Sequence, residues 1–556
     1  MRSPVVLFAA VAAVVTASAC QPARLPETYG PVDLVVAATT DIHGYVRGWD
    51  YYANAPDTLR GLTRVATIID SLRRVSPTFP VVVDAGDIIQ GTPLAFVSAR
   101  VDTTMRHPVI AAMNAIQYDA AAVGNHEFNY GFPTLDRAIR QAEFPLLATN
   151  VDGPDGRPRF RQWAVSTRRG IKIAIVGATT PGANVWDRDN LAGRARVGDI
   201  IPDVRATVQE ARNAGSAVVI VVVHSGLDEP SSYDTVGTRV ASENVAARLA
   251  HEVPGIDLIV YGHSHKQMAD TVIAGTLLMQ PRNWATSVAI AHLTLDRRDG
   301  RWRVIRKRSS IVQAAHHAES PSLLAVTQEG HRAALAYVNT TIGTTPVAWR
   351  ADSARVVDTP LIDFILEVER KATGAQLAST AAFSLDASIA AGPITVARIA
   401  ALYPYDNTLR AIKISGAQLR DYLEQSARYF RTSEGGRIDI DPSIPGYNYD
   451  IVAGVDYTID LSKPAGSRIS TLDFGGRPVV PTDTFTMALN NYRQTGGGGF
   501  AMLRGAPVVY DHQQEIRQLL IDEVRAKKTL VPADYFHPNW RIVPATAIGG
   551  LLKTRE

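Results

Sequence analysis

Five short segments in the first half of the chain combine residue types that bind metal ions. Each segment directly follows an apolar run, and together they hold five of the 13 histidines of the chain. One His or Asp at the end of a strand is more often a cap or a hydrogen-bonded surface residue than a ligand. Five such segments in one chain are more informative, and they predict a metal centre. The segments are Asp41-Ile42-His43, Asp84 with Gly86-Asp87, Gly124-Asn125-His126-Glu127, His224-Ser225-Gly226 and Gly262-His263-Ser264-His265.

The apolar runs before these segments are short, rich in β-branched residues and bounded by Gly or Asp. This pattern predicts buried β-strands at residues 32–39, 81–83, 120–123, 217–223 and 257–261. In an open α/β sheet, ligands bind in the crevice beyond the carboxyl ends of the parallel strands. We therefore expect the five segments to meet in one crevice.

The residue types in these segments suit a pair of divalent ions. Because two neighbouring cations repel each other, a carboxylate must bridge them, and we assign this role to Asp84. Mn²⁺, Zn²⁺, Co²⁺ or iron accepts the mixture of carboxylate, imidazole and amide oxygen on offer. Such a pair polarises a phosphoryl oxygen and lowers the pKa of bound water, while His126 donates a proton or a hydrogen bond to the phosphate. The predicted ligands are Asp41, His43 and His265 for the first ion, and Asn125, His224 and His263 for the second.

The order of the motifs resembles that of the calcineurin-like metallophosphoesterases. The resemblance is closer to a bacterial periplasmic branch, which contains 5′-nucleotidases and 2′,3′-cyclic-nucleotide 2′-phosphodiesterase/3′-nucleotidases, and it extends from about Val32 to about Ala506. It implies a four-layer α/β/β/α sandwich followed by a smaller α+β C-terminal domain that binds substrate. It also implies hydrolysis of nucleotide phosphoesters by a metal-bound water.

Two segments of the second half resemble the base-binding segments of this branch. They are Tyr403-Pro404-Tyr405-Asp406-Asn407-Thr408-Leu409 and the run from Asn490 to Phe500. Two aromatic faces can sandwich a purine, with about 1–3 kcal/mol of stacking per base. In 5′-nucleotidases an Asp of the Gly-rich loop meets the ribose, and here Gly498 occupies that position. The predicted substrate contacts are Tyr405, Asn407, Tyr492 and Gly498.

Details of the motifs favour the cyclic-phosphodiesterase members of the branch. In 5′-nucleotidases an Asp usually stands three residues after the catalytic-type His, whereas this chain has Asn129, which can orient an imidazole but cannot stabilise its charge. Residues 383–388 also lack the Gly-Gly-x-Arg phosphate clamp. We therefore expect 2′,3′-cyclic nucleotides and 3′-nucleotides as substrates. The alternatives are a 5′-nucleotidase or UDP-sugar hydrolase, and a nucleotide-binding lipoprotein without catalysis. The absence of His-Glu-x-x-His argues against a zinc protease.

The start of the chain predicts export. Met1-Arg2-Ser3 is basic, residues 4–15 are apolar, and Ala17-Ser18-Ala19 precedes Cys20, the only cysteine. This pattern favours a lipoprotein signal with acyl chains on Cys20, although Ala-Ser-Ala also fits ordinary signal cleavage. Gln21 is compatible with sorting to the outer membrane. We expect a periplasmic monomer anchored there by lipid.

Length and composition predict a globular chain of at least two domains. The chain has 556 residues, 46% of them apolar and 20% charged, and a net charge of only +3, which does not indicate a polynucleotide-binding surface. The expected division is a signal peptide (1–19), a tether (20–31), the catalytic domain (32–312), a linker helix region (313–345), the C-terminal nucleotide-binding domain (346–540) and a tail (541–556).

Several other helices and strands are predicted from start and stop residues and from the spacing of apolar residues. Helices are expected at 62–75 and 323–338, from Pro360 to a stop at Gly374, and at 416–430 with Ser415 as the N-cap. The later strands, at 277–280, 288–295 and 302–306, are expected to close a second sheet.

Overall fold

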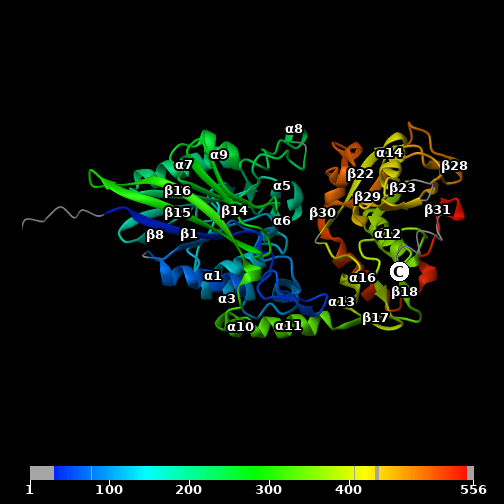
Figure 1. The fold of residues 1–556 in the computed structure, drawn as a ribbon, viewed down its shortest axis with the longest axis horizontal. Coiled ribbons are helices and arrows are strands. Elements are labelled where there is room, and N and C mark those ends of the chain that lie inside the picture. Colours follow the sequence, from blue (N-terminus) through cyan, green and yellow to red (C-terminus); the bar gives the residue numbers. More distant parts are fainter. Residues whose placement is uncertain (1–29, 77, 234, 406, 433–437, 547–556) are drawn as a thin grey trace, which may run out of the picture.

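The computed structural model describes residues 30–76, 78–233, 235–405, 407–432 and 438–546, which form two domains joined by a pair of helices (Figure 1). The predicted signal peptide, Cys20 and the last ten residues lie outside the described residues. Among the helices within those ranges, none is long and apolar enough to cross a membrane.

The first domain contains two six-stranded sheets that face each other. In the first sheet the order is β16-β15-β1-β4-β5-β6, and β1, β4, β5 and β6 run parallel. Their bounds are β1 (Val32–Thr39), β4 (Val81–Asp84), β5 (Ala120–Ala122), β6 (Leu146–Leu147), β15 (Ser287–Arg298) and β16 (Arg301–Gln313). The strands before the first three metal-binding segments are thus present and parallel, as predicted.

The second sheet has the order β13-β14-β12-β11-β9-β8, with parallel strands at its centre. The strands before the last two segments, β11 and β12, lie side by side there, as predicted. The bounds are β8 (Trp163–Arg168), β9 (Ile171–Thr179), β11 (Val218–His224), β12 (Leu258–Tyr261), β13 (Met268–Ile273) and β14 (Thr276–Gln280).

Helices cover the outer faces of both sheets. Leu34 and Val36 of β1 pack with Ile220 and Val222 of β11 in the core between the sheets. The other faces of the strands pack under helices, which gives the predicted α/β/β/α layers. The helices are α1 (Leu62–Val75), α3 (Pro108–Ile116) and α4 (Phe132–Gln141) on the first sheet, and α7 (Ile200–Asn213) and α9 (Ala246–Glu252) on the second.

The placement of the later strands differs from the prediction. Only β14 joins the second sheet, whereas β15 returns to the first sheet and pairs antiparallel with β1, with Val32 opposite Leu295. β16 then forms the edge of that sheet. Both faces of β15 carry apolar residues in its first half, so strand spacing alone did not specify the partner.

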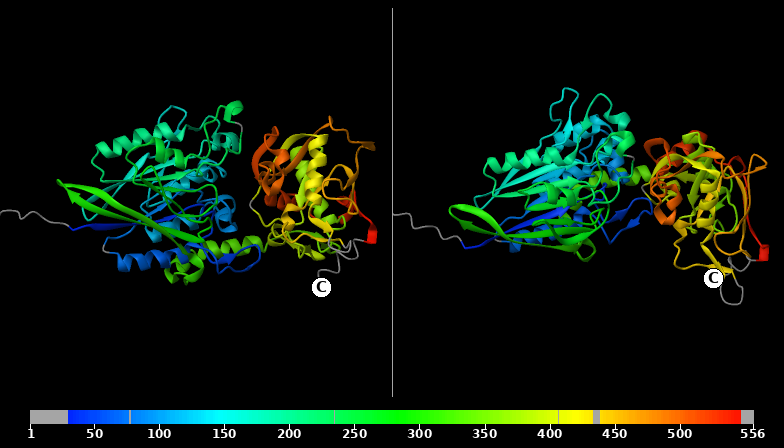
Figure 2. Two further views of the ribbon diagram at one scale, coloured as in Figure 1. Left: turned by 45° about the horizontal axis from the view of Figure 1, so that its top comes forward. Right: turned by 90° about the horizontal axis from the view of Figure 1, so that it is seen from above.

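The predicted linker helix is two helices, α10 (Pro321–Val326) and α11 (Gln328–Val338). The break falls at the buried Thr327, whose hydroxyl donates to the carbonyl of Leu323. Leu323, Ala334 and Val338 belong to the core of the first domain. Figure 2 shows the helix pair running along that domain toward the second one.

The C-terminal domain is built on a five-stranded sheet and a smaller four-stranded one. The first comprises β19 (Leu377–Ala381), β22 (Thr408–Ser415), β25 (Asp450–Ala453), β29 (Thr484–Asn490) and β30 (Val508–Glu515). The second comprises β26 (Asp456–Asp460), β27 (Ile469–Phe474), β28 (Arg477–Pro478) and β31 (Trp540–Val543). The main helices are α12 (Pro360–Thr373), α14 (Gly416–Ala427) and α16 (Ile516–Lys527).

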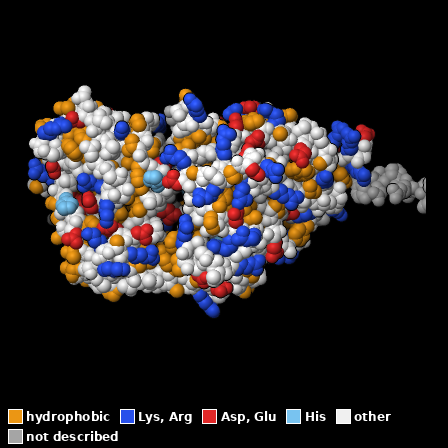
Figure 3. All heavy atoms as spheres, turned by 180° about the vertical axis from the view of Figure 1, so that it is seen from behind, with side chains coloured by type: hydrophobic (Ala, Val, Ile, Leu, Met, Phe, Trp, Pro, Cys, Tyr) orange, Lys and Arg blue, Asp and Glu red, His pale blue; other side chains and the backbone are white. Residues whose placement is uncertain are grey.

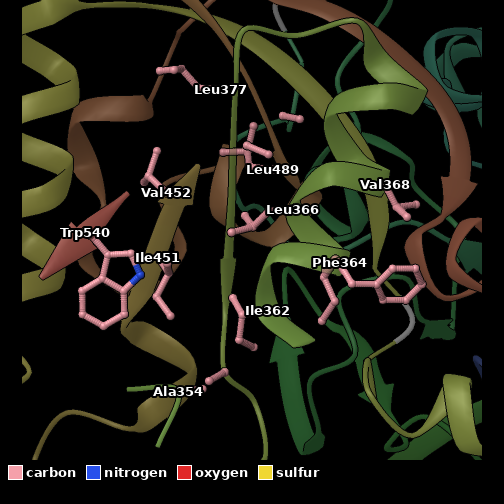
Figure 4. Close-up of a cluster of buried hydrophobic side chains, with 14 of the residues drawn as sticks. Ala354, Ile362, Phe364, Leu366, Val368, Leu377, Ile451, Val452, Leu489 and Trp540 are labelled. Atoms are coloured by element: carbon pink, nitrogen blue, oxygen red, sulfur yellow. The ribbon is translucent and has the colours of Figure 1, made fainter. Parts of the chain in front are cut away.

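Helix α12 is buried on nearly all sides, and Figure 4 shows its apolar side chains packed against the strands around it. It ends at Gly374, whose left-handed φ of 67° suits glycine. Ser415 caps α14 in a capping box with Gln418. The helix end at Gly374 and the N-cap at Ser415 were both predicted.

Shorter elements complete the two domains. The helices among them include α2 (Pro93–Phe96), α5 (Ala183–Trp186), α6 (Arg188–Leu191), α13 (Val396–Ala400) and α15 (Asn491–Gln494). The two-stranded pairs are β2 (Trp49–Asp50) with β3 (Ala55–Pro56), β7 (Val151–Asp152) with β10 (Arg196–Val197), β17 (Thr341–Thr345) with β21 (Gly392–Thr395), β18 (Trp349–Arg350) with β20 (Ser388–Ile389), and β23 (Phe430–Thr432) with β24 (Ile438–Ile440).

Candidate metal centre

The five predicted segments meet at the carboxyl ends of strands from both sheets. Three segments follow β1, β4 and β5 of the first sheet, and two end or follow β11 and β12 of the second. Backbone hydrogen bonds join the first two loops, since Asp41 N donates to the carbonyl of Gly86, and His43 N donates to that of Asp87, both at 2.9 Å. The crevice is therefore formed by two facing sheets rather than by one.

Five residues of these loops have a left-handed backbone. Their φ angles lie between 47° and 71°, where a side chain other than glycine is uncommon. Each such conformation costs about 1–3 kcal/mol and persists where surrounding structure enforces it, which is typical of functional sites. The five residues are Asp41, His43, Asp87, His263 and His265.

The first group of possible ligands is Asp41, His43 and His265. Nε2 of His265 lies 3.4 Å from Oδ1 of Asp41 and 3.1 Å from Nε2 of His43. Asp41 is fully buried, and its carboxylate also accepts from the backbone N–H of His263 and the hydroxyl of Thr40. The three side chains predicted for the first ion therefore lie together.

The second group has Asp87 at its centre. One oxygen of this carboxylate, Oδ2, lies 2.9 Å from Nε2 of His224, 3.7 Å from Nε2 of His43 and 4.0 Å from Nε2 of His126. His263 belongs to the same group as Asp87 and His224. Among the described residues, Asp87 is thus the one carboxylate grouped with ligands of both predicted sets.

The assignment of the bridge to Asp84 is corrected by this geometry. Asp84 is the last residue of β4, and its carboxylate accepts from the hydroxyl of Thr39 at 2.6 Å and from the backbone N–H of Gly86 at 2.8 Å. It is in none of the three groups of possible ligands among the described residues. The chain turns at Gly86, with a φ of 99°, and this turn directs Asp87 rather than Asp84 to the histidines.

Two features of the donor set suit bound cations. The Oδ1 atom of the buried Asn125 has no hydrogen-bond partner, which is costly unless another ligand satisfies it. The Nε2 atoms of His43 and His265 face each other at 3.1 Å, and two neutral imidazoles satisfy both atoms at once when they share an ion. The residues present therefore fit a pair of divalent metal ions.

The electrostatics point the same way. Burial lowers the pKa of His43 to about 4, so its ring is neutral at pH 7 and has a lone pair to offer. Burial also disfavours a charged His224, yet the adjacent Asp87 outweighs this and raises its pKa to about 10. Asp41 and Asp87, although buried, have pKa values below the usual range because histidines surround them. A strong negative potential thus favours positive charge at this point.

Other buried groups hold the ligand loops in place. The carboxylate of Glu127 accepts from the backbone N–H groups of Asp87, Ile88, Ile89 and Gly124, at 2.6–3.2 Å, and so fastens two of the loops together. Nδ1 of His224 lies 2.8 Å from the carbonyl of Ala85, which directs Nε2 to the site. Glu127 stood in a predicted motif without an assigned role.

His126 forms the third group of possible ligands with His43 and Asp87, and its backbone N–H donates to Asp87 at 2.8 Å. Its Nδ1 is 2.5 Å from Oδ1 of Asn129, as the spacing of the two residues led us to expect. Burial would lower the pKa of His126, but Asp87 and the contact with Asn129 raise it. A further carboxylate, Asp187, lies behind Asn129, and no sequence motif indicated it.

Comparison with known proteins agrees with this geometry. Residues 34–267 match the family model of the calcineurin-like phosphoesterases, and residues 341–505 match that of the 5′-nucleotidase C-terminal domain. The chain is 31% identical to a Haemophilus influenzae protein named 2′,3′-cyclic-nucleotide 2′-phosphodiesterase/3′-nucleotidase, over 93% of this chain and 88% of that one. The chain belongs to the calcineurin-like phosphoesterases.

Two further proteins are similar to this chain. It is 30% identical to the trifunctional nucleotide phosphoesterase YfkN of Bacillus subtilis, over 94% of this chain but only 40% of that protein's length. A putative 5′-nucleotidase from Staphylococcus aureus, solved with α-ketoglutarate, has the same fold, with a TM-score of 0.67 and 24% identity over 92% of this chain and 99% of that one. The predicted family and two-domain fold are confirmed.

The 5′-nucleotidase C-terminal domain presents a group of exposed tyrosines. Tyr405, Tyr447 and Tyr492 have 40–46% of their surface exposed. The ring of Tyr405 lies edge-on to those of Phe383, at 5.1 Å, and Tyr447, at 6.3 Å. Burial, together with Tyr447 and Tyr492, raises the pKa of Tyr405. Tyr447 was not predicted, since it lies outside both quoted segments.

The two other predicted substrate contacts, Asn407 and Gly498, lie close to other side chains of the C-terminal domain. The side chain of Asn407 contacts the buried Tyr403. Gly498 has a φ of 73°, and a Cβ there would lie 2.1 Å from Oδ1 of Asn448 and 2.3 Å from a guanidinium nitrogen of Arg493. The Gly-rich loop therefore has no room for a side chain at residue 498. Arg493 in turn is fixed by a buried ion pair with Asp450.

Gln90 of the catalytic domain links the metal centre to the C-terminal domain. The amide nitrogen of Gln90 bonds the carboxylate of Glu515 at the end of β30, while its Oε1 lies 3.3 Å from Nδ1 of His43. A second contact across the domains joins Asp189 and His512 at 3.2 Å. The surface is hollowed where the two domains meet, and Lys, Arg, Asp and Glu side chains are interspersed on that face (Figure 3).

Proposed function

We propose that the protein hydrolyses 2′,3′-cyclic nucleotides and 3′-nucleotides with a pair of divalent ions. The observation that carries the proposal is the meeting of two ligand groups at one carboxylate, Asp87. The substrate class is supported by similarity to the Haemophilus influenzae protein of that name. The proposed ligands are Asp41, His43, Asp87, Asn125, His224, His263 and His265.

The metal ions are proposed to be Mn²⁺, Zn²⁺, Co²⁺ or iron, because these ions accept mixed imidazole, carboxylate and amide ligands. Bound there, they would polarise a phosphoryl oxygen and lower the pKa of water. The chain contributes four histidines, two carboxylates and one amide. Five of these seven residues have a left-handed backbone, and Glu127 fastens two of the ligand loops together. Chelation is expected to abolish hydrolysis, and adding back Mn²⁺ is expected to restore it.

Besides the metal ligands, the chain supplies His126 to interact with the phosphate. His126 adjoins the ligand Asn125, and its ring is held from behind by Asn129. We propose that Nε2 of His126 donates a hydrogen bond or a proton to the phosphate. Asn129 stands where the 5′-nucleotidase pattern has an Asp. This difference in the sequence supports a preference for cyclic and 3′-nucleotides over 5′-nucleotides.

A substrate panel tests the proposed function. The purified protein with Mn²⁺ is assayed on 2′,3′-cyclic AMP, 3′-AMP, 5′-AMP and UDP-glucose. We expect the largest kcat/KM for the cyclic nucleotide, then 3′-AMP, with weak turnover of 5′-AMP. A preference for 5′-AMP or UDP-glucose would assign the protein to the 5′-nucleotidases instead, and nucleotide binding without turnover of any substrate would point to a binding protein.

The exposed tyrosines are proposed to hold the nucleobase. Tyr405 and Tyr492 stack on the base, Tyr447 is a third candidate wall, and each stacking contact contributes about 1–3 kcal/mol. Tyr405→Ala and Tyr492→Ala are therefore expected to raise KM for nucleotides about 5- to 100-fold. KM for p-nitrophenyl phosphate, which has no base, is expected to change little. Equal losses for both substrates would make these tyrosines structural.

We also propose that the protein is periplasmic and held at the outer membrane by acyl chains on Cys20. The support is the sequence pattern around this residue, which lies outside the described residues. Each buried CH₂ of an acyl chain contributes about 0.8 kcal/mol, so several chains anchor firmly. The wild-type protein is expected to partition into detergent, and Cys20→Ser to release it or block its processing. A mature protein with an unmodified Cys20 thiol would argue against the anchor.

A further inference from the structure

Behind His126, two side chains form a chain that ends on a buried carboxylate. Nδ1 of His126 lies 2.5 Å from Oδ1 of Asn129. The amide nitrogen of Asn129 donates to both carboxylate oxygens of Asp187, at 3.0 Å each. Asp187 is 58 residues later in the sequence, between α5 and α6, and is 3% exposed. Both ends of the Asn129 side-chain amide therefore have partners within the protein.

The carboxylate decides how the Asn129 amide is turned. A carboxylate accepts hydrogen bonds and cannot donate them, so the NH₂ end of the amide must face Asp187. The carbonyl end must then face His126, where it accepts from Nδ1–H. This fixes the tautomer and the tilt of the ring, and leaves Nε2 as the nitrogen that interacts with substrate.

Neighbouring contacts hold the carboxylate itself in position. The side-chain nitrogen of Asn190 donates to Asp187 at 3.2 Å and lies 3.4 Å from the backbone carbonyl of Asn129. The preceding Trp186 stacks on the ring of the proposed ligand His263, with ring centres 5.5 Å apart and planes 26° apart. Residues 186–190 thus contact the proposed ligand His263 directly and His126 through Asn129.

We propose that Asp187 is a positioning residue that acts on His126 through the side-chain amide of Asn129. The proposal rests on the proposed function, because it concerns the histidine assigned to the phosphate. In this chain a side-chain amide stands directly behind the histidine, and a carboxylate from another loop supports that amide. Asp187 touches neither the phosphate nor the proposed ligands of the metal ions by any hydrogen bond that the described residues show.

A set of double variants tests this order of contacts. Asp187→Asn is isosteric but can both donate and accept, so it no longer fixes the amide. Its kcat on 2′,3′-cyclic AMP is expected to fall about 10- to 100-fold, with KM changed by less than about 2-fold. In an Asn129→Ala background, and in a His126→Ala background, the same substitution is expected to cost less than about 2-fold. Arg188→Gln, at the exposed next residue, is the matched control and is expected to keep full activity.

An exchange of the two side chains gives a second, opposite test. Asn129→Asp alone sets two carboxylates against each other where a hydrogen bond of 3.0 Å now stands, and is expected to lower kcat. The exchange variant, Asn129→Asp with Asp187→Asn, restores one amide and one carboxylate and is expected to exceed both single variants in kcat. If Asp187→Asn does not fold, Asn129→Asp combined with Asp187→Ser makes the same comparison.

Two results would overturn the proposal. One is a full loss on Asp187→Asn in the His126→Ala background, which would make the effect a general structural one. The other is an exchange variant no better than the product of its single variants. Both differ from failure of the proposed function, in which the wild-type protein itself would not turn over cyclic nucleotides. Metal content, measured for every variant, is expected to stay at the wild-type level.

Discussion

At the scale of single residues, two aspartates three positions apart have different surroundings. Asp87 lies among His43, His126 and His224, whereas Asp84 is enclosed by Thr39 and Gly86. Burial raises the pKa of Asp84 to about 7, which fits a carboxyl group that serves hydrogen bonds within the protein. The two residues should therefore respond differently to the same substitution.

Asp87→Asn is expected to remove metal and activity together, because it takes away the carboxylate that both ligand groups share. Asp84→Asn keeps the shape of a group that supports the site from outside, so we expect a loss of only about 10- to 100-fold in kcat/KM, with metal content retained. Elemental analysis of the purified variants and assays at saturating Mn²⁺ check both. The assignment of the bridge fails if Asp87→Asn binds a full complement of metal and Asp84→Asn does not.

The residue types of the site were predictable, but their directions were not. The position of Asp41, His43, Asn125, His224 and the last two histidines followed from where apolar runs end. Asp84 and Asp87 flank a turn at Gly86, and no periodicity tells which of them a left-handed turn directs inward. Asp187 belongs to no sequence motif. It lies between two short helices, and its partner Asn129 is 58 residues away in the sequence.

At the scale of elements, the five strands before the metal-binding segments were predictable within a residue or two, whereas β15 and β16 extend to Arg298 and Gln313, beyond the predicted ends at 295 and 306. The pairing of the strands was less predictable. β1 and α1 have the predicted bounds because β1 is largely apolar and the apolar residues of α1 keep helical spacing. The return of β15 to β1 is a long-range choice between two similar apolar faces, which local sequence does not encode. The break between α10 and α11 falls at Thr327, whose buried hydroxyl donates to the carbonyl of Leu323.

Helix α12 of the C-terminal domain contains a fully buried carboxyl group, that of Glu369. Neither of its oxygens has a hydrogen-bond partner, and burial, with nearby Asp450, raises its pKa well above 4.5. The folded protein therefore keeps this proton to a higher pH than the unfolded chain does. Its contribution to stability is fully present below about pH 4.5 and declines as the pH rises toward the pKa of the folded state.

Glu369→Gln removes this titration from the helix. The free energy of unfolding of the variant, relative to wild type, is expected to rise with pH above about 4.5, by at most about 1.4 kcal/mol per pH unit. Urea unfolding at pH 5, 6, 7 and 8 measures it. Glu367→Gln, on the same helix with an exposed ion pair to Arg370, is the matched control and should show no such trend. A difference for Glu369→Gln that does not vary with pH would mean that the carboxyl group is ionised in the folded state.

At the scale of the whole molecule, each domain has a core of its own, but the helix pair between them belongs to the first. Leu323, Ala334 and Val338 lie in the catalytic core. Gly330 packs so closely on Pro108 that an added Cβ would lie 2.9 Å from the Pro108 Cβ. The contacts that cross between the domains include the hydrogen bond of Gln90 with Glu515, the packing of Ala397 in the catalytic core, and that of Tyr52 and Tyr337 against the C-terminal core. Most buried apolar residues of the catalytic domain pack within that domain, so its separation exposes only a limited apolar surface.

A chain that ends after Thr340 is therefore expected to fold, bind metal and hydrolyse p-nitrophenyl phosphate slowly, without preference for nucleotides, because it lacks the tyrosine cluster. A chain that ends after Gln313 loses the helix pair as well, and each fully buried Leu or Val side chain contributes about 1.5–3 kcal/mol. Its melting temperature should be clearly lower, or it should not fold. Thermal unfolding of both chains, with kcat/KM for the aryl phosphate and for 2′,3′-cyclic AMP, compares them. Equal stability of the two chains would show that the helices are a mere linker, and retained nucleotide preference in the longer one would place base recognition in the catalytic domain.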